Sequence, residues 1–410
     1  QIEQHKIEFI KMYKVFFTKK DDTKNNPWIS RSKNSWTLQI FCLSPSVGMK
    51  ALVKQEVHNV IITSGTLCPL DSFEIELGIP FPIKLQNSHV IKKHQLNISI
   101  IGSSSNGFKL CSTYDNRENQ ESYKALGQTL VELLQVIPGG VFIFFSSYTS
   151  LERSIEMWKN NDLTWKIWQI LCSTKKIFIE PRNKVQFAKS INEYKIEIDN
   201  KIGAAFLGVC RGKLAEGLDL SNNYCRAVIM TGLPYVNRYD PRVMLKEKYI
   251  DEMKFPYFTS KNWYAIQMTR ALNQAVGRVV RHKDDFGAVI LCDARFFLLK
   301  NGLPNWIENL MISDNSENKV KIGKIKTFFQ QLGYSVCNTT STMTITNQTI
   351  IKSKTIEIET NLTQKNKSDV INDRFISQTK LFSEFSSQES YKSLSTTNNV
   401  FDALTSRKHD

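Results

Sequence analysis

The sequence lacks the patterns that mark several common kinds of site. Its eight cysteines stand singly, with no C-x-x-C pair, so a zinc or iron–sulfur site built from this chain alone is not expected. No stretch matches G-x-x-x-x-G-K-[ST], the loop that holds nucleotide phosphates in many ATPases. No apolar run reaches the roughly 20 residues that cross a bilayer, and the opening QIEQHKIEFI is no signal peptide. Single thiols within apolar runs suit a reducing compartment.

An excess of negative charge is also lacking, and the basic excess points to a polyanionic partner. The formal net charge is +15, from 54 Lys and Arg against 39 Asp and Glu. Residues 338–410 hold nine basic and eight acidic residues, a balance of only +1, so the remaining +14 lies in residues 1–337. The charge therefore belongs to the part of the chain that we expect to fold, and nucleic acid is the favoured partner.

Short apolar runs alternate with stretches of helical period from Trp36 onward. The runs are too short for helices and rich in β-branched or aromatic residues, so each predicts a strand buried on both faces: TLQIFCL, NVIITS, VFIFFSS, KIFIEP, AAFLGVC, AVIMTG and GAVILCD. The stretches 123–137, 148–158 and 263–280 predict helices. This alternation predicts an α/β fold with a mainly parallel sheet. The first 35 residues are irregular, and residues 338–410 have the polar composition of a disordered tail.

Unusual polar groups follow four of the expected strands. They are TSGTL at 63–67, SSY at 146–148, RGKLAEGLDL at 211–220 and GLPY at 232–235. Small residues let a backbone approach a phosphate, while hydroxyls and N–H groups supply donors. Each motif alone is ordinary turn chemistry more often than not. Four of them at successive strand ends favour a shared binding edge.

The stretch QAVGRVVRH at 274–282 adds two arginines and a glutamine. Gln274, Arg278 and Arg281 stand at i, i+4 and i+7, so a helix would place them on one face, with Gly277 leaving its centre open. Such a face is either a solvated basic stripe or a surface that grips an anion. For the neighbouring His282 we favour a packing or hydrogen-bonding role.

Taken in order, these motifs resemble those of superfamily 2 helicases of the XPD-like iron–sulfur group. The matching segments are TSGTL, FFSSY, VCRGKLAEGLDL and QAVGRVVRHKDDFGAVILCD. Flanking segments at 79–91, 240–253 and 262–282 are most similar to the telomere-elongation branch of the group, with the Fanconi anaemia group J branch as a near alternative. The resemblance covers about 36–332. It implies an α/β, RecA-like fold in which a parallel sheet is sandwiched by helices, the second motor domain of a 5′–3′ DNA helicase.

The resemblance also implies roles for named residues. Gln274, Arg278 and Arg281 would face the γ-phosphate of ATP, the arginines acting as arginine fingers. Gly217 and Asp219 would lie near the nucleotide. Thr63, Ser64, Gly65 and Thr66 would couple the nucleotide cleft to the DNA channel. The remaining strand-end residues would contact DNA, and they are Ser146, Ser147, Tyr148, Arg211, Lys213 and Thr231.

Three parts of such a helicase have no match: the phosphate loop, the acidic Mg²⁺ box and the four cluster cysteines. We therefore expect the chain to be the carboxyl-terminal half of a helicase, with residues 1–35 a remnant of an inserted, arch-type domain and 36–337 the motor domain. ATP, Mg²⁺ and the 4Fe–4S cluster would depend on the other half, and this chain alone would not hydrolyse ATP. A non-catalytic nucleic-acid-binding protein and an RNA substrate stay open as alternatives.

The expected partners are DNA and the first motor domain, in the nucleus. In the tail, QTKLFSEF partly resembles a sliding-clamp-binding peptide through Gln378, Leu381 and Phe385. Glu384 stands where such peptides carry an aromatic residue, and chance matches are common in a tail of this composition.

Overall fold

The computed structural model describes residues 10–19, 36–64, 67, 69–86, 91–160, 165–200, 203–216, 220–299 and 316–334. The chain divides into two units, Gln1–Cys337 and Asn338–Asp410, and the second lies outside the described residues. The expected disordered tail and clamp-binding residues Gln378, Leu381 and Phe385 therefore lie outside them too. None of the described helices combines the length and apolar character that a membrane crossing requires.

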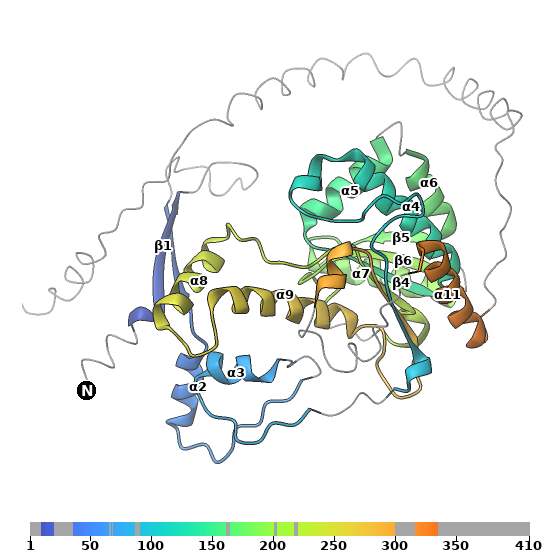
Figure 1. The fold of residues 1–410 in the computed structure, drawn as a ribbon. Coiled ribbons are helices and arrows are strands. Elements are labelled where there is room, and N and C mark those ends of the chain that lie inside the picture. Colours follow the sequence, from blue (N-terminus) through green and yellow to red (C-terminus); the bar gives the residue numbers. More distant parts are fainter. Residues whose placement is uncertain are drawn as a thin grey trace, which may run out of the picture. The chain divides into compact units, whose positions relative to one another are not determined.

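A six-stranded parallel sheet forms the centre of the first unit (Figure 1). Its strands lie side by side in the order β3 (Leu96–Ile100), β8 (Gly287–Leu291), β7 (Ala227–Met230), β4 (Gly140–Phe145), β6 (Ala204–Val209) and β5 (Lys176–Ile179). The inner strands β4, β6, β7 and β8 are buried at every position, which explains their uninterrupted apolar sequences. The predicted α/β class with a parallel sheet is confirmed.

Helices cover both faces of this sheet. Apolar residues of α4 (Gln120–Val136), α5 (Tyr148–Asn160), α6 (Trp165–Thr174) and α11 (Asn318–Gln331) share one core with Val141, Ile143 and Phe145 of β4. On the opposite face, α7 (Lys184–Asp199) and α9 (Ser260–Val276) pack on Phe142 and Phe144. Successive side chains of β4 thus enter opposite cores, as the twofold period of a strand requires.

A smaller element group packs at the start of α9. It contains α8 (Pro241–Met253), α2 (Ser46–Val53), α3 (Leu70–Leu77) and an antiparallel ribbon of β1 (Tyr13–Lys19) with β2 (Trp36–Cys42). Leu43, Tyr249, Phe258 and Trp263 are buried in its core. Polar side chains start the helices here: Asp240 Oδ1 accepts from the Arg242 amide at α8, and Thr259 Oγ1 accepts from the Asn262 amide at α9.

Two of the expected buried strands are wrong. TLQIFCL lies in β2, which pairs antiparallel with β1 outside the parallel sheet, and Leu38 and Ile40 are more than half exposed. NVIITS is no strand, and Ile61 is 86% exposed. Apolar composition predicted burial in both cases, but no neighbouring strand or helix of the described chain covers these residues. Two strands, β1 and β3, were not predicted.

Candidate functional site

The segment with Gln274, Arg278 and Arg281 does not form the continuous helix that the spacing predicts. Helix α9 ends at Val276, and the Arg278 and Val279 amides donate to carbonyls three residues back, at Ala275 and Val276, in a tighter turn. Gly277, a weak helix former, stands at this end. The half-buried Gln274 lies on the last turn of α9, whereas Arg278 and Arg281 lie on the loop leading to β8. The single helical face is therefore wrong, although the three residues stay close in sequence around one helix end.

Arg278 reaches the loop that follows β6. Its Nη2 donates to the carbonyl oxygen of Ala215. Ala215 is buried and stands two residues before Gly217, the first of the predicted nucleotide-binding pair. Gly217 and Asp219 themselves lie outside the described residues. The contact nevertheless joins two motifs that are about 60 residues apart along the chain.

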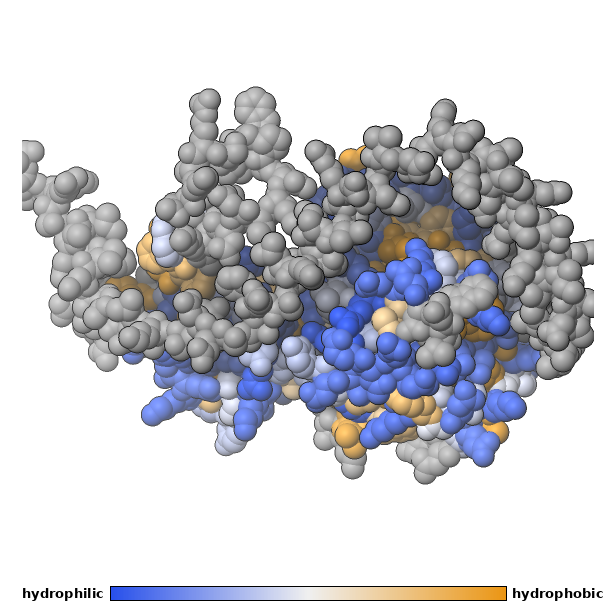
Figure 2. All heavy atoms as spheres, turned by 90° about the horizontal axis from the view of Figure 1, so that it is seen from above, coloured by the Kyte–Doolittle hydropathy of each residue, from blue (hydrophilic) through white to orange (hydrophobic). Residues whose placement is uncertain are grey.

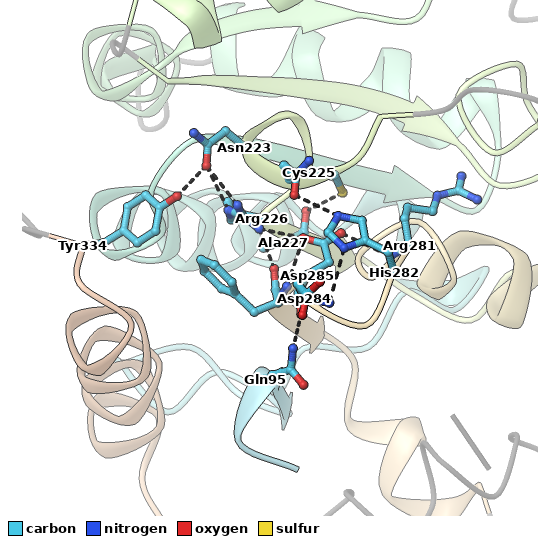
Figure 3. A network of polar contacts seen from close by, with 12 residues as sticks. Gln95, Asn223, Cys225, Arg226, Ala227, Arg281, His282, Asp284, Asp285 and Tyr334 are labelled. Atoms are coloured by element: carbon cyan, nitrogen blue, oxygen red, sulfur yellow. Dashed lines mark hydrogen bonds and ion pairs between the residues drawn. The ribbon is translucent and has the colours of Figure 1, made fainter. Parts of the chain in front are cut away.

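A buried ion pair supports the loop that carries the arginines (Figure 3). Arg226 Nη1 lies 2.9 Å from Asp285 Oδ1, and the two side chains are 5% and 0% exposed. The second carboxylate oxygen of Asp285 accepts a hydrogen bond from the backbone amide of Arg281 at 3.2 Å. Figure 3 shows the Arg281 side chain directed away from this network. The backbone of Arg281 is thus fixed while its side chain extends outward.

Further contacts close the network around Arg226. Its Nε and Nη2 donate to Asn223 Oδ1 at 3.2 and 3.0 Å, and its guanidinium lies 3.9 Å from the centroid of the Phe286 ring. The Tyr334 hydroxyl also donates to Asn223 Oδ1. A charge this deeply buried requires such pairing, because an unpaired guanidinium in the core is costly.

His282 takes part in hydrogen bonding at the edge of the same network. Its Nε2 lies 3.0 Å from Asn222 Oδ1, and its Nδ1 accepts from the Asp284 amide at 3.3 Å. Asn222 has a positive φ of 58°, a conformation that asparagine tolerates better than most residues.

The strand-end residues predicted to contact DNA fall into different environments. Ser147 Oγ accepts from the Ser150 amide at 3.1 Å and caps the start of α5, so it has a structural use. Ser146 and Tyr148 are half-buried beside it. Thr231 is only 5% exposed, and its hydroxyl donates to the Phe144 carbonyl at 3.1 Å; its predicted contact with DNA stays a prediction.

Arg211 and Lys213 begin the loop after β6. The Arg211 backbone is left-handed, with φ 64°, a strained state for an arginine. Its guanidinium donates to the carbonyls of Pro234 and Gln267 at 2.8 and 2.6 Å, and burial lowers its pKa. Lys213 is half-buried, and its Nζ donates to the Pro181 carbonyl at 3.3 Å. Arg211 therefore links the end of β6 to α9, the helix that carries Gln274.

The predicted coupling motif is only partly described. Thr63 and Ser64 are exposed, and Gly65 and Thr66 lie outside the described residues. The next helix, α3, is fastened to α9 by Arg270, whose Nη1 lies 2.9 Å from Glu76 and whose Nη2 donates to Ser72 at 2.8 Å. Arg270 stands one helical turn before Gln274. A physical connection therefore runs from the segment after the predicted coupling motif to the helix that carries Gln274.

Sequence reasoning missed Arg226, Arg270 and Asp285, and also Glu180, which follows β5 and is 3% exposed. Glu180 lies inside the predicted strand KIFIEP, and Asp285 lies two residues before GAVILCD. A buried acidic side chain is uncommon at such positions, which made them an available signal. Arg226 and Arg270 gave no comparable signal, since their partners lie far away along the chain. Among the described residues no three His, Cys, Asp or Glu side chains group as metal ligands.

The surface of the described part is mostly hydrophilic on the face drawn in Figure 2.

Comparison with known proteins gives a consistent result. Residues 130–310 match the helicase C-terminal domain family. Over 294 residues the chain is 42% identical to Regulator of telomere elongation helicase 1 from Pongo abelii and 42% identical to that of Homo sapiens, which covers 69% of this chain but 22% and 24% of those proteins. The solved structure titled XPD_Helicase is 22% identical, with a TM-score of 0.49, covering 67% of this chain and 44% of that one. The chain thus spans about a quarter of the curated relatives' length.

Proposed function

We propose that this chain, a homologue of the regulator of telomere elongation helicases, acts as the second motor domain of an ATP-dependent DNA helicase. The parent activity would be 5′–3′ unwinding in genome and telomere maintenance in the nucleus. The observation that carries the proposal is the fixed arginine loop: Arg278 is held against the Ala215 carbonyl, and the Arg281 backbone is held by Asp285. The Arg281 side chain meanwhile extends outward, as a group that acts on a nucleotide held by another domain requires.

The proposed chemistry divides the active site between two motor domains. ATP with Mg²⁺ supplies the phosphoryl group, and the first motor domain would hold it, since residues of a phosphate loop are not among those found here. Gln274 would orient the attacking water, and Arg278 and Arg281 would stabilise charge on the transferring group. Arginine suits this role because its guanidinium stays charged and offers a planar fork of donors.

The residues present fit that role in one further respect. A guanidinium has five N–H donors. The hydrogen bond from Arg278 Nη2 to the Ala215 carbonyl uses one of them and orients the guanidinium. The fixed backbone at Arg281 reduces the reorganisation needed when charge develops. Because both arginines would act on a nucleotide bound elsewhere, we expect the isolated chain to show no ATP turnover.

A chimera provides the test. Residues 36–332 of this chain would replace the matched segment of human Regulator of telomere elongation helicase 1, and ATP turnover would be measured with and without single-stranded DNA. The proposal expects DNA-stimulated turnover by the chimera and none by the 410-residue chain alone. An inactive but folded chimera, or DNA-stimulated turnover by the chain alone, would contradict it.

A further inference from the structure

Glu180 is a buried carboxylate at the carboxyl ends of the strands, and the proposed function leaves it without a role. It follows β5 directly and is 3% exposed. Its carboxylate reaches across the end of β6 toward the end of β4. One oxygen, Oε1, accepts from the Tyr148 hydroxyl at 2.8 Å and from the Lys213 amide at 2.6 Å. The other, Oε2, accepts from the Val209 amide at 3.0 Å.

The chain is shaped to admit this carboxylate. A Cβ on Gly208 would lie 2.9 Å from Glu180 Oε2, and a Cβ on Gly212 would lie 2.5 Å from Oε1. Any larger residue at either position would therefore collide with the carboxylate. The two glycines flank the strained Arg211, so the carboxylate sits inside the turn that it holds.

The same carboxylate also defines the surroundings of Tyr148. The Tyr148 hydroxyl donates to Glu180, and the Arg182 guanidinium lies 4.8 Å from the centroid of the Tyr148 ring. Burial, followed by the hydrogen bond to Glu180, raises the pKa of Tyr148 to about 12, so the hydroxyl remains a donor at neutral pH. Tyr148 and the 209–213 turn come from different strands, and Glu180 is the side chain that bonds to both.

We propose that Glu180 is a positioning residue that joins Tyr148 and the turn carrying Lys213 into one rigid contact for a single nucleic-acid strand. This inference rests on the proposed function, because it assumes that the strand-end residues face DNA. Glu180 itself touches no nucleic acid. It sets the spacing between an aromatic ring suited to stacking and a lysine suited to a phosphate.

The glutamine variant tests this arrangement with little change of shape. In Glu180→Gln the amide group must face at least one of the N–H donors at Val209 or Lys213, whichever way the side chain turns. Tyr148→Phe removes only the hydroxyl. Glu193→Gln on α7 is the matched control, since Glu193 is about half exposed and its one ion pair, with Lys189, is exposed.

Binding of a 20-nucleotide oligo-dT to the 410-residue chain would be measured by fluorescence anisotropy at several salt concentrations, well below the thermal midpoint. Glu180→Gln is expected to raise Kd roughly tenfold and to reduce the salt slope by about 0.7, the loss of one phosphate contact on a single strand. Lys213→Ala should reduce the slope equally. The double variant Glu180→Gln with Tyr148→Phe should raise Kd by less than the product of the increases in Kd caused by the two single variants.

Three other outcomes are distinguishable. If Glu180→Gln lowers the thermal midpoint but leaves Kd and slope as in the parent and Glu193→Gln, the residue is only structural and the inference is overturned. Should that variant fail to fold, additive effects of Tyr148→Phe and Lys213→Ala on Kd would overturn it instead. If the parent chain binds no oligo-dT, the DNA-binding part of the proposed function fails, and this inference fails with it.

Discussion

Replacing Asp285 by asparagine should destabilise the fold and release the arginine loop together. The substitution removes the charge that pairs with Arg226, which is only 5% exposed. Removing one partner of a buried ion pair costs about 3–5 kcal/mol, because the other charge is left unpaired in the core. Arg226 keeps its bonds to Asn223 and its contact with the Phe286 ring, so we expect the lower end, about 3 kcal/mol. That corresponds to a thermal midpoint lowered by roughly 6–12 °C.

Two measurements check this expectation. Denaturant unfolding of the 410-residue chain gives the change in stability, with Asp284→Asn as the control because Asp284 is the exposed neighbour. Hydrogen exchange gives the local effect: the Arg281 amide loses its carboxylate acceptor and should exchange faster. The paired change Arg226→Met with Asp285→Leu should cost less than Asp285→Asn alone, since an apolar pair leaves no buried charge. A loss below about 1 kcal/mol, with unchanged exchange at Arg281, would refute the reasoning.

Other predictions concern parts of the molecule away from this pair. Burial lowers the pKa of Lys175 from 10.5 to about 8. Between pH 8 and 10.5 the unfolded chain therefore binds more protons than the folded one, so the free energy of unfolding should rise with pH by about 3 kcal/mol across that window. Lys175→Met should remove this rise. A variant with the same pH profile of stability as the parent would count against the prediction. Arg270→Gln should loosen α3 from α9 and lower DNA stimulation of the chimera more than its basal turnover, with exposed Lys248→Gln as the control. Ellman's reagent should modify Cys42 in the folded chain but Cys210 only after unfolding, because burial blocks access to the Cys210 thiol and raises its pKa. Equal rates of modification of the two thiols in the folded chain would contradict this.

The parallel sheet could be predicted because its inner strands are buried on both faces. A run such as VFIFF fills two cores at once, so its composition alone identifies it. The same rule failed for TLQIFCL and NVIITS, where Leu38, Ile40 and Ile61 stay exposed in the described chain. Apolar composition indicates a tendency to be buried, but burial also requires a neighbouring strand or helix that covers the residues.

The roles of the site residues stay predictions, but the local geometry around them can be compared with what the spacing predicted. Spacing placed Gln274, Arg278 and Arg281 on one helical face, yet α9 ends at Val276. Tertiary contacts decide that ending: Arg278 bonds to Ala215, and Asp285 holds the Arg281 amide. Such long-range partners cannot be found from local periodicity. Buried supporting groups like Glu180 were missed for the same reason.

The central claim is that Arg281 acts on a nucleotide held by another domain, and one measurement addresses it directly. DNA-stimulated ATP turnover would be compared between the chimera, its Arg281→Ala variant and its Lys283→Ala variant, which removes an exposed cation two residues away. Arginine fingers contribute about 10³–10⁵ in rate, so we expect Arg281→Ala to lose that much and Lys283→Ala to stay near the parent. Turnover of the Arg281→Ala chimera within about threefold of the parent would contradict the claim.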